Sequence, residues 1–237
     1  MEKRNIFIVL WIAQLTFLSG FLNGGSLLLY SNALSHHTGN LTRAAAALSR
    51  ADFYAAAGLL LLPVSFFAGA FLSGLLFHEK NFALSKRYGI LLMSFSLVFA
   101  TVRLFTFPLG LTCAIICVIL GIQNGMFIFY KGILIRTTHL SGYLTDAALC
   151  LGGALRNKTA TGKKKSVDIP RPDTENTAPI KRVPFYLFNI VCFMSGAACS
   201  VHTRIYSFFL TAALLYFVCG LYYFVLRICT LPPKRRT

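Results

Sequence analysis

SGFLNG at residues 19–24 and HHTGNLT at residues 36–42 are the most informative stretches of the chain, because both recur in its second half. Their counterparts are LGIQNG at residues 120–125 and HLSGYLT at residues 139–145. In a membrane protein, a polar motif on equivalent segments of two halves is a strong indication of a functional site. The duplication therefore predicts where a site lies, and says much less about its ligand.

The composition places the chain among membrane proteins. Hydrophobic residues make up 56% of the sequence and the mean hydropathy is +0.67, far above the balance of a soluble domain. Runs of about twenty apolar residues recur, and each is long enough to cross a hydrocarbon core about 30 Å thick. These runs are residues 6–30, 53–77, 88–107, 109–130, 183–202 and 205–226. We therefore predict an all-α membrane protein with six transmembrane helices, in contact with the lipid bilayer.

The basic residues are distributed unevenly along the chain. The formal net charge is +16, which in a soluble protein would indicate binding to nucleic acid. If the N-terminus is cytoplasmic, nineteen of the 23 Lys and Arg fall on the inner segments 1–5, 78–87, 131–182 and 227–237. This asymmetry follows the positive-inside rule. We expect a multi-pass protein with both termini in the cytoplasm and no nucleic-acid partner.

Each half reads as a helix, a polar motif segment and two further helices. Three spans is an odd number, so the second half must enter the membrane from the opposite side, as an inverted repeat. We expect a first three-helix repeat at residues 1–107 with its motif at 36–42. The fourth helix and the second motif, at 139–145, fall within residues 108–155, and the last two helices and a basic tail occupy residues 183–237.

Small residues four positions apart indicate close packing in the second and fifth predicted helices. Gly69 with Ser73, and Gly196 with Ser200, are small-xxx-small pairs, which allow two helix backbones to approach each other. We interpret these pairs as packing seams rather than as binding sites.

An insert at residues 156–182 separates the second motif from the fifth predicted helix. It carries eight Lys or Arg, three acidic residues and three prolines, with almost no large apolar side chain. Such a segment cannot form a core, so we predict a basic, disordered cytoplasmic linker. Its run Lys163-Lys164-Lys165 is expected to contact anionic lipid, at about 1 kcal/mol per charge.

The two motif segments are too polar in the middle to be ordinary spans, and each leads into a short predicted helix. The helices are expected at residues 41–48 and 144–155, with Thr38 or Asn40, and Ser141, as natural N-caps. If both helices enter the bilayer from opposite faces, their N-terminal N–H groups and positive dipole ends converge near the midplane. That arrangement suits a small polar or anionic solute.

The predicted central site draws on both motifs and on the first and fourth helices. Its substrate-binding residues are Thr38, Gly39, Asn40, Ser141, Gly142, Asn23, Gln123 and Asn124, with Gln14 lining the same site. Two other interpretations remain open. The motif segments are interfacial helices that simply end the preceding span, or the amide side chains are interhelical hydrogen-bond partners worth less than about 1–2 kcal/mol each.

Three histidines accompany the motifs. His36, His37 and His139 are candidates for a proton-linked role or for structural hydrogen bonds. No Cys or carboxylate completes a ligand set beside His36 and His37, so we expect neither a metal nor another cofactor. No acidic residue lies midway along an apolar run, and no hydrolase or metalloprotease motif occurs. These absences argue against an enzyme.

At these residues the chain resembles the YoaK-type bacterial inner-membrane proteins. The resemblance rests on HTGNLT at 37–42, LGIQNG at 120–125, and RTTH followed by SGYLTD within 136–146, in that order. That family is catalogued as a domain of unknown function and is loosely labelled as permeases. The chain departs from it at Asn23, where many members carry Asp, and in the long Lys-rich insert.

The resemblance implies a multi-pass protein of the bacterial inner membrane and names no substrate. From the sequence we expect a transporter or permease of a small polar or anionic solute, with a central site between the two repeated motifs. The alternative is a non-transporting membrane scaffold or sensor that uses the duplicated motif for packing or for binding a partner.

Overall fold

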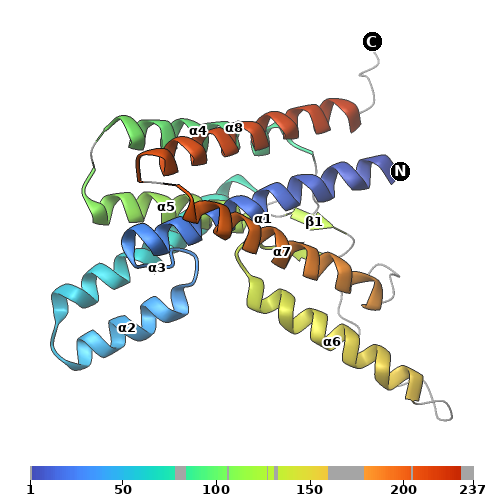
Figure 1. Ribbon diagram of the computed structural model, residues 1–237, viewed down its shortest axis with the longest axis horizontal. Helices are drawn as coiled ribbons and strands as arrows, with labels where there is room; N and C mark the ends of the chain where they lie inside the picture. The colour runs from blue at the N-terminus through green and yellow to red at the C-terminus, as the bar shows by residue number, and fades with distance from the viewer. Residues whose placement is uncertain are drawn as a thin grey trace.

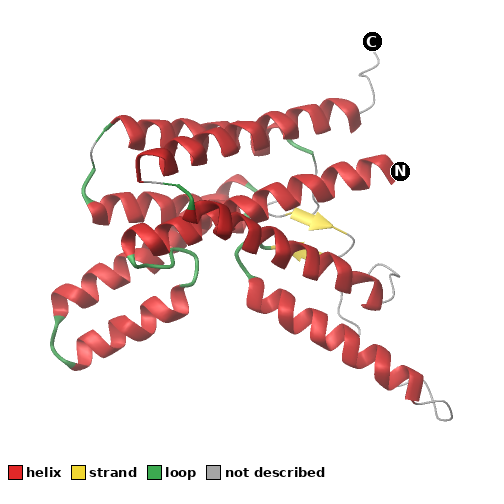
Figure 2. Ribbon diagram, viewed as in Figure 1, coloured by secondary structure: helices red, strands yellow, loops and turns green. Residues whose placement is uncertain are grey.

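The computed structural model describes residues 2–77, 84–105, 107–126, 128–130, 133–159, 179–203 and 205–230. Within these ranges the chain forms eight α-helices, one two-stranded hairpin and one short 3-10 helix (Figures 1 and 2). The elements are α1 (Glu2–Tyr30), α2 (His37–Ser49), α3 (Phe53–Leu76), α4 (Lys86–Leu104), α5 (Leu109–Gly125), β1 (Ile128–Tyr130), β2 (Ile133–Ile135), α6 (Leu140–Thr159), η1 (Pro179–Arg182), α7 (Val183–Val201) and α8 (Ile205–Thr230). The predicted all-α class is confirmed.

Five of the described helices are long and apolar enough to cross a membrane. They are α1, α3, α4, α7 and α8. Large apolar side chains cover their outer surfaces; Phe67 on α3, for example, is 71% exposed. In water such a surface would drive aggregation, whereas lipid tails cover it at no cost. The chain is therefore an integral membrane protein in contact with the bilayer.

The helix predicted over residues 109–130 ends at Gly125, so its last turn is wrong. The 17 residues of α5 span about 26 Å, less than the hydrocarbon thickness. The chain continues as the antiparallel hairpin β1–β2, in which Ile128 pairs with Ile135 and Tyr130 with Ile133. The β-branched and aromatic residues of both strands favour this extended conformation.

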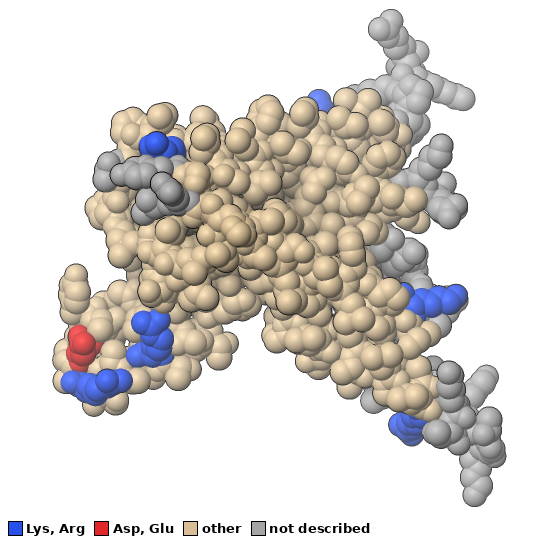
Figure 3. Space-filling model, in the orientation of Figure 1, with Lys and Arg blue, Asp and Glu red and all other residues tan. Residues whose placement is uncertain are grey.

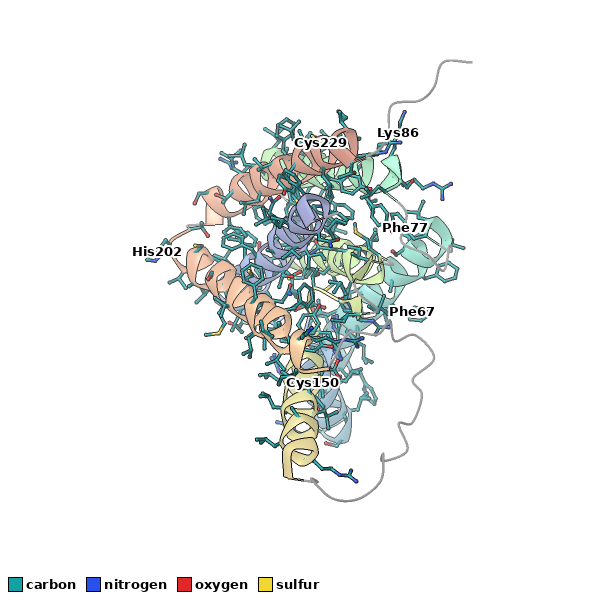
Figure 4. All side chains as sticks on the ribbon, turned by 90° about the vertical axis from the view of Figure 1, so that its right-hand side faces the viewer. Phe67, Phe77, Lys86, Cys150, His202 and Cys229 are labelled. Atoms are coloured by element: carbon teal, nitrogen blue, oxygen red, sulfur yellow. The ribbon has the colours of Figure 1, made fainter. Side chains whose placement is uncertain are left out.

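The helices pack mainly in pairs, and most pairs join the two halves of the sequence. α1 lies against α7, α3 against α5, and α4 against α8, while α2 packs on α3 and α6 packs on α7. In Figure 1 the N- and C-terminal ends lie at the same end of the molecule, and α2 and α6 diverge below the paired helices. Figure 4, turned by 90°, shows α6 with Cys150 projecting downward in the same way.

Two glycines bring the backbones of α1 and α7 into direct contact. A Cβ atom added to Gly20 would overlap the carbonyl oxygen of Phe193, and one added to Gly196 would overlap the carbonyl oxygen of Phe17. At each glycine, a carbonyl oxygen of the opposite helix thus occupies the space that a side chain would need. Because no side chain fits between the two helices here, the crossing point is fixed by residues that lack one.

The contact between α3 and α5 repeats this arrangement. A Cβ atom on Gly69 would overlap the carbonyl oxygen of Val118, and one on Gly121 would overlap the carbonyl oxygen of Phe66. Gly20 and Gly121 occupy the same place in the duplicated motif, so the two crossings are built from equivalent residues. The prediction that Gly69 and Gly196 lie in packing seams is confirmed.

The close approach at Gly69 predicts that alanine substitutions at two glycines of α3 change the stability of the protein by very different amounts. Gly69→Ala forces α3 and α5 apart and is expected to destabilise the protein by about 1–3 kcal/mol, the usual cost of overpacking. Gly74→Ala is the matched control, since a Cβ there meets nothing within 4 Å. Thermal unfolding of both variants in detergent measures the difference, and equal midpoints would show that the seam does not hold the helices.

Candidate functional site

The two motif helices begin near the middle of the molecule and run toward opposite ends (Figure 1). The molecular surface is concave between these two helices (Figure 3). α2 begins at His37 and α6 at Leu140, several residues earlier than predicted. The predicted N-caps are therefore wrong: Thr38, Asn40 and Ser141 lie inside the first helical turns. His36 holds the cap position of α2 without a side-chain hydrogen bond.

Two equivalent asparagines hold the segments that lead into these helices. The Asn23 Oδ1 atom accepts hydrogen bonds from the Ser35 backbone N–H at 3.1 Å and from the Ser35 hydroxyl at 2.9 Å. The Asn124 Oδ1 atom accepts from the Thr138 N–H at 3.3 Å and from the Thr138 hydroxyl at 2.9 Å. Ser35 and Thr138 each stand two residues before their helix. Each asparagine thus fixes the segment before its motif helix through two hydrogen bonds. We call these contacts, of Asn23 with Ser35 and of Asn124 with Thr138, the asparagine latches.

Gln123 is the centre of a buried hydrogen-bond network. The two N–H groups of its Nε2 atom are shared among three acceptors, the Leu15 carbonyl at 2.9 Å, the Ser19 hydroxyl at 2.9 Å and the Thr137 hydroxyl at 3.0 Å. Its Oε1 atom accepts from the Tyr216 hydroxyl at 2.6 Å. Both ends of this amide are engaged, and the network ties α1, α5 and α8 to the segment before α6.

Sequence reasoning missed three members of this network. Ser19 is the first residue of the SGFLNG motif, and Thr137 lies two residues before the HLSGYLT motif. Their closeness to the motifs could have indicated that they belong to the network. Tyr216 is 93 residues away from Gln123 along the chain, and nothing in its neighbourhood distinguishes it from the other aromatic residues of α8.

Seven of the eight predicted substrate-binding residues fall into two groups. Thr38, Gly39 and Ser141 are exposed at the start of α2 and α6. Asn40 is buried and donates to the Ala33 carbonyl at 3.2 Å, so it joins Asn23, Gln123 and Asn124 in internal hydrogen bonds. The first group is accessible to a ligand, whereas the second group positions the helices that carry it.

Gly142 differs from Gly39 in its surroundings. A Cβ atom on Gly142 would overlap the imidazole of His139, which lies over the first turn of α6. A Cβ atom on Gly39 meets nothing within 4 Å. Only the second motif therefore needs glycine to accommodate its histidine.

The family of the chain is shown by a family model that matches most of its length. The model of a family described as a protein of unknown function, DUF1275, matches residues 11–226. The chain belongs to this family. The match covers both motifs and reaches from α1 to α8, and the YoaK-type resemblance is consistent with it. No curated protein matches the chain. No solved structure matches it either.

The motif histidines of this DUF1275 protein have different neighbours: the ring of His36 faces Phe193 on α7, that of His37 faces Phe66 on α3, and that of His139 lies beside Gly142. The rings of His37 and Phe66 are 4.6 Å apart, and both His37 nitrogens are buried without a hydrogen-bond partner. Burial, with a smaller contribution from His36, lowers the pKa of His37 to about 4, so this side chain is neutral at pH 7. Among the described residues, no three His, Cys, Asp or Glu side chains are placed to share a metal ion.

Two sequence predictions fall elsewhere. Gln14 does not join the central network; it lies in a groove between α1, α7 and α8. The Lys163-Lys164-Lys165 run lies outside the described residues. The segment predicted as a linker from residue 156 remains helical to Thr159 in α6, and η1 precedes α7.

The asparagine latch predicts losses of stability of different size for two substitutions of Asn23. Asn23→Leu has a similar size but leaves the buried Ser35 N–H and hydroxyl unpaired, which is expected to cost about 1–3 kcal/mol. Asn23→Asp keeps an acceptor oxygen at the same place and is expected to lose clearly less. Thermal unfolding in detergent measures both, and a leucine variant as stable as the native protein would contradict the latch.

Proposed function

We propose that this DUF1275 protein crosses the bacterial inner membrane six times as two inverted three-helix repeats, with both termini in the cytoplasm. The equivalent glycine crossings and asparagine latches of the two halves support this topology. In the proposed topology, α5 and the following hairpin together form the fourth crossing. The basic residues of segments 78–87 and 131–182 then lie on the same side as the termini.

We further propose that the protein is a transporter or permease that binds a small polar or anionic solute between the first turns of α2 and α6. This proposal rests on the exposure of these two turns at the concave surface from which the helices diverge. The first N–H groups of an α-helix have no partner within the helix, and its dipole is positive there. Two such ends attract an anion or a polar group.

The roles of the residues follow from their accessibility. The hydroxyls of Thr38 and Ser141 and the backbone at Gly39 and Gly142 contact the solute. Asn23 and Asn124 hold the two turns in place. Gln123 connects α1 and α8 to the segment before α6. The protein makes no covalent change to the solute in this proposal.

A second candidate function is a non-transporting membrane scaffold or sensor. The engagement of Asn23, Asn40, Gln123 and Asn124 in internal hydrogen bonds favours it, because these residues then serve packing alone. In that case the exposed first turns of α2 and α6 meet a protein partner or lipid headgroups.

A ligand screen separates the two candidates. Purified protein in detergent is heated with small anions, amino acids, sugars and nucleobases, and the unfolding midpoint is measured. A ligand of the native state stabilises it by RT ln(1 + [L]/Kd), about 2.7 kcal/mol at a hundredfold excess over Kd. We expect one class of solute to raise the midpoint, and Thr38→Ala with Ser141→Ala to remove the increase.

The control for this screen lies one turn further along the same helices. Thr42 and Thr145 are exposed, and their hydroxyls donate to the Thr38 and Ser141 carbonyls at 2.9 Å. Thr42→Ala with Thr145→Ala should therefore keep the ligand effect. If no solute changes the midpoint of a well-folded protein, or if both double variants lose the effect equally, the central site is contradicted.

A further inference from the structure

Three helix ends meet at one edge of the molecule, and basic side chains gather there. α3 ends at Leu76, α4 begins at Lys86 and α8 ends at Thr230. Figure 4 shows Lys86 and Cys229, which mark the start of α4 and the end of α8, at the same upper edge. We call the basic residues at this edge the basic cluster, and they are Lys86, Arg87 and Arg227.

Hydrogen bonds to backbone carbonyls fix the two arginines of the cluster. The Arg87 Nη1 atom donates to the Leu76 carbonyl at 3.0 Å, at the end of α3. The Arg227 Nε atom donates to the Leu84 carbonyl at 3.0 Å, two residues before Lys86. A guanidinium carries several N–H groups in a rigid fork, and each of these bonds uses one of them. The fixed side chains therefore still present donors for an anion, and phosphate matches their geometry.

The charges of the cluster have the same sign. Lys86 and Arg87 open α4, whose first turn holds no acidic residue, and the dipole of a helix is positive at this end. No hydrogen bond or ion pair among the described residues joins the cluster to a carboxylate; Glu79 lies outside the described residues. Like charges this close repel each other, so an anion bound among them is favoured.

Exposed apolar side chains continue from the basic cluster along both helices. Ile90 lies four residues after Lys86, on the same face of α4, and is 57% exposed. On α8, Ile228 follows Arg227 and is 75% exposed. α4 and α8 are both long and apolar enough to cross the membrane, so this surface faces lipid tails. The cations at the ends of these helices then lie at the level of the headgroups.

We propose that the basic cluster is a binding site for an anionic phospholipid, whose phosphate accepts hydrogen bonds from the cluster and whose acyl chains lie along the apolar surface of α4 and α8. Inorganic phosphate matches the cations but not the apolar surface. A zwitterionic lipid brings a cationic group that the cluster repels. The proposal does not depend on the solute site between α2 and α6.

The test adds lipid to the delipidated protein in a non-ionic detergent and measures the unfolding midpoint. The probes are dioleoylphosphatidylglycerol, dioleoylphosphatidylcholine and inorganic phosphate. A ligand that binds the native state stabilises it, so we expect the anionic lipid to raise the midpoint at a clearly lower concentration than the zwitterionic lipid. Equal effects of the two lipids would overturn the proposal. An effect of inorganic phosphate as strong as that of the anionic lipid would also overturn it, since the site would then take a free anion.

Three variants complete the test, each compared with its own midpoint without lipid so that lost stability is not counted as lost binding. Lys86→Gln removes one charge and leaves both carbonyl bonds of the arginines in place. It should weaken binding of the anionic lipid about fivefold, as expected for one basic charge at a membrane surface. Arg227→Gln should weaken binding at least as much.

Arg50→Gln is the matched control. The Arg50 Nε atom also donates to a carbonyl, that of Ala46 at 3.1 Å, but it lies at the end of α2, away from the cluster. This variant should bind the anionic lipid as the native protein does. If Lys86→Gln and Arg227→Gln bind the lipid as tightly as Arg50→Gln, the basic cluster is not its site.

Discussion

The close approach of backbones at four glycines is the constraint on which the remaining structure depends. Lipid tails are as apolar as leucine side chains, so helices in a membrane gain little from the hydrophobic effect and associate through packing and hydrogen bonds. Gly20 with Gly196, and Gly69 with Gly121, allow two pairs of helices to touch through their main chains. These crossings join elements from different halves of the sequence and so fix how the halves interlock.

The polar residues of the motifs act within that frame. Asn23 and Asn124 stand three residues after Gly20 and Gly121, so the same helix segments that form the crossings also hold the chain before α2 and α6. Gln123 links both halves through Ser19, Thr137 and Tyr216. A displacement at a crossing would therefore move both motif helices, which is the coupling that alternating access in the proposed inverted-repeat transporter requires.

The sequence predicted the membrane class, the places of the long helices and the packing seams, because these depend on hydropathy and on small residues at fixed spacing. It did not predict the end of α5 at Gly125, since the apolar run continues through residues that suit a strand equally well. The N-caps were wrong because the loops before α2 and α6 are held by distant asparagines rather than by their own side chains. The partner of Gln123 on α8 and the outward groove at Gln14 both depend on tertiary packing, which hydropathy does not encode.

The convergence of the two motif helices at the centre of the molecule can be tested by measuring the distance between their starts. Spin labels at Thr38→Cys and Ser141→Cys, in a protein whose seven native cysteines are replaced, report this distance by pulsed electron resonance in nanodiscs. Labels at Ser49→Cys and Leu155→Cys mark the far parts of the same helices. We expect a clearly shorter distance for the first pair than for the second. Equal distances, or a longer one for the first pair, would contradict helices that begin together at the centre and diverge.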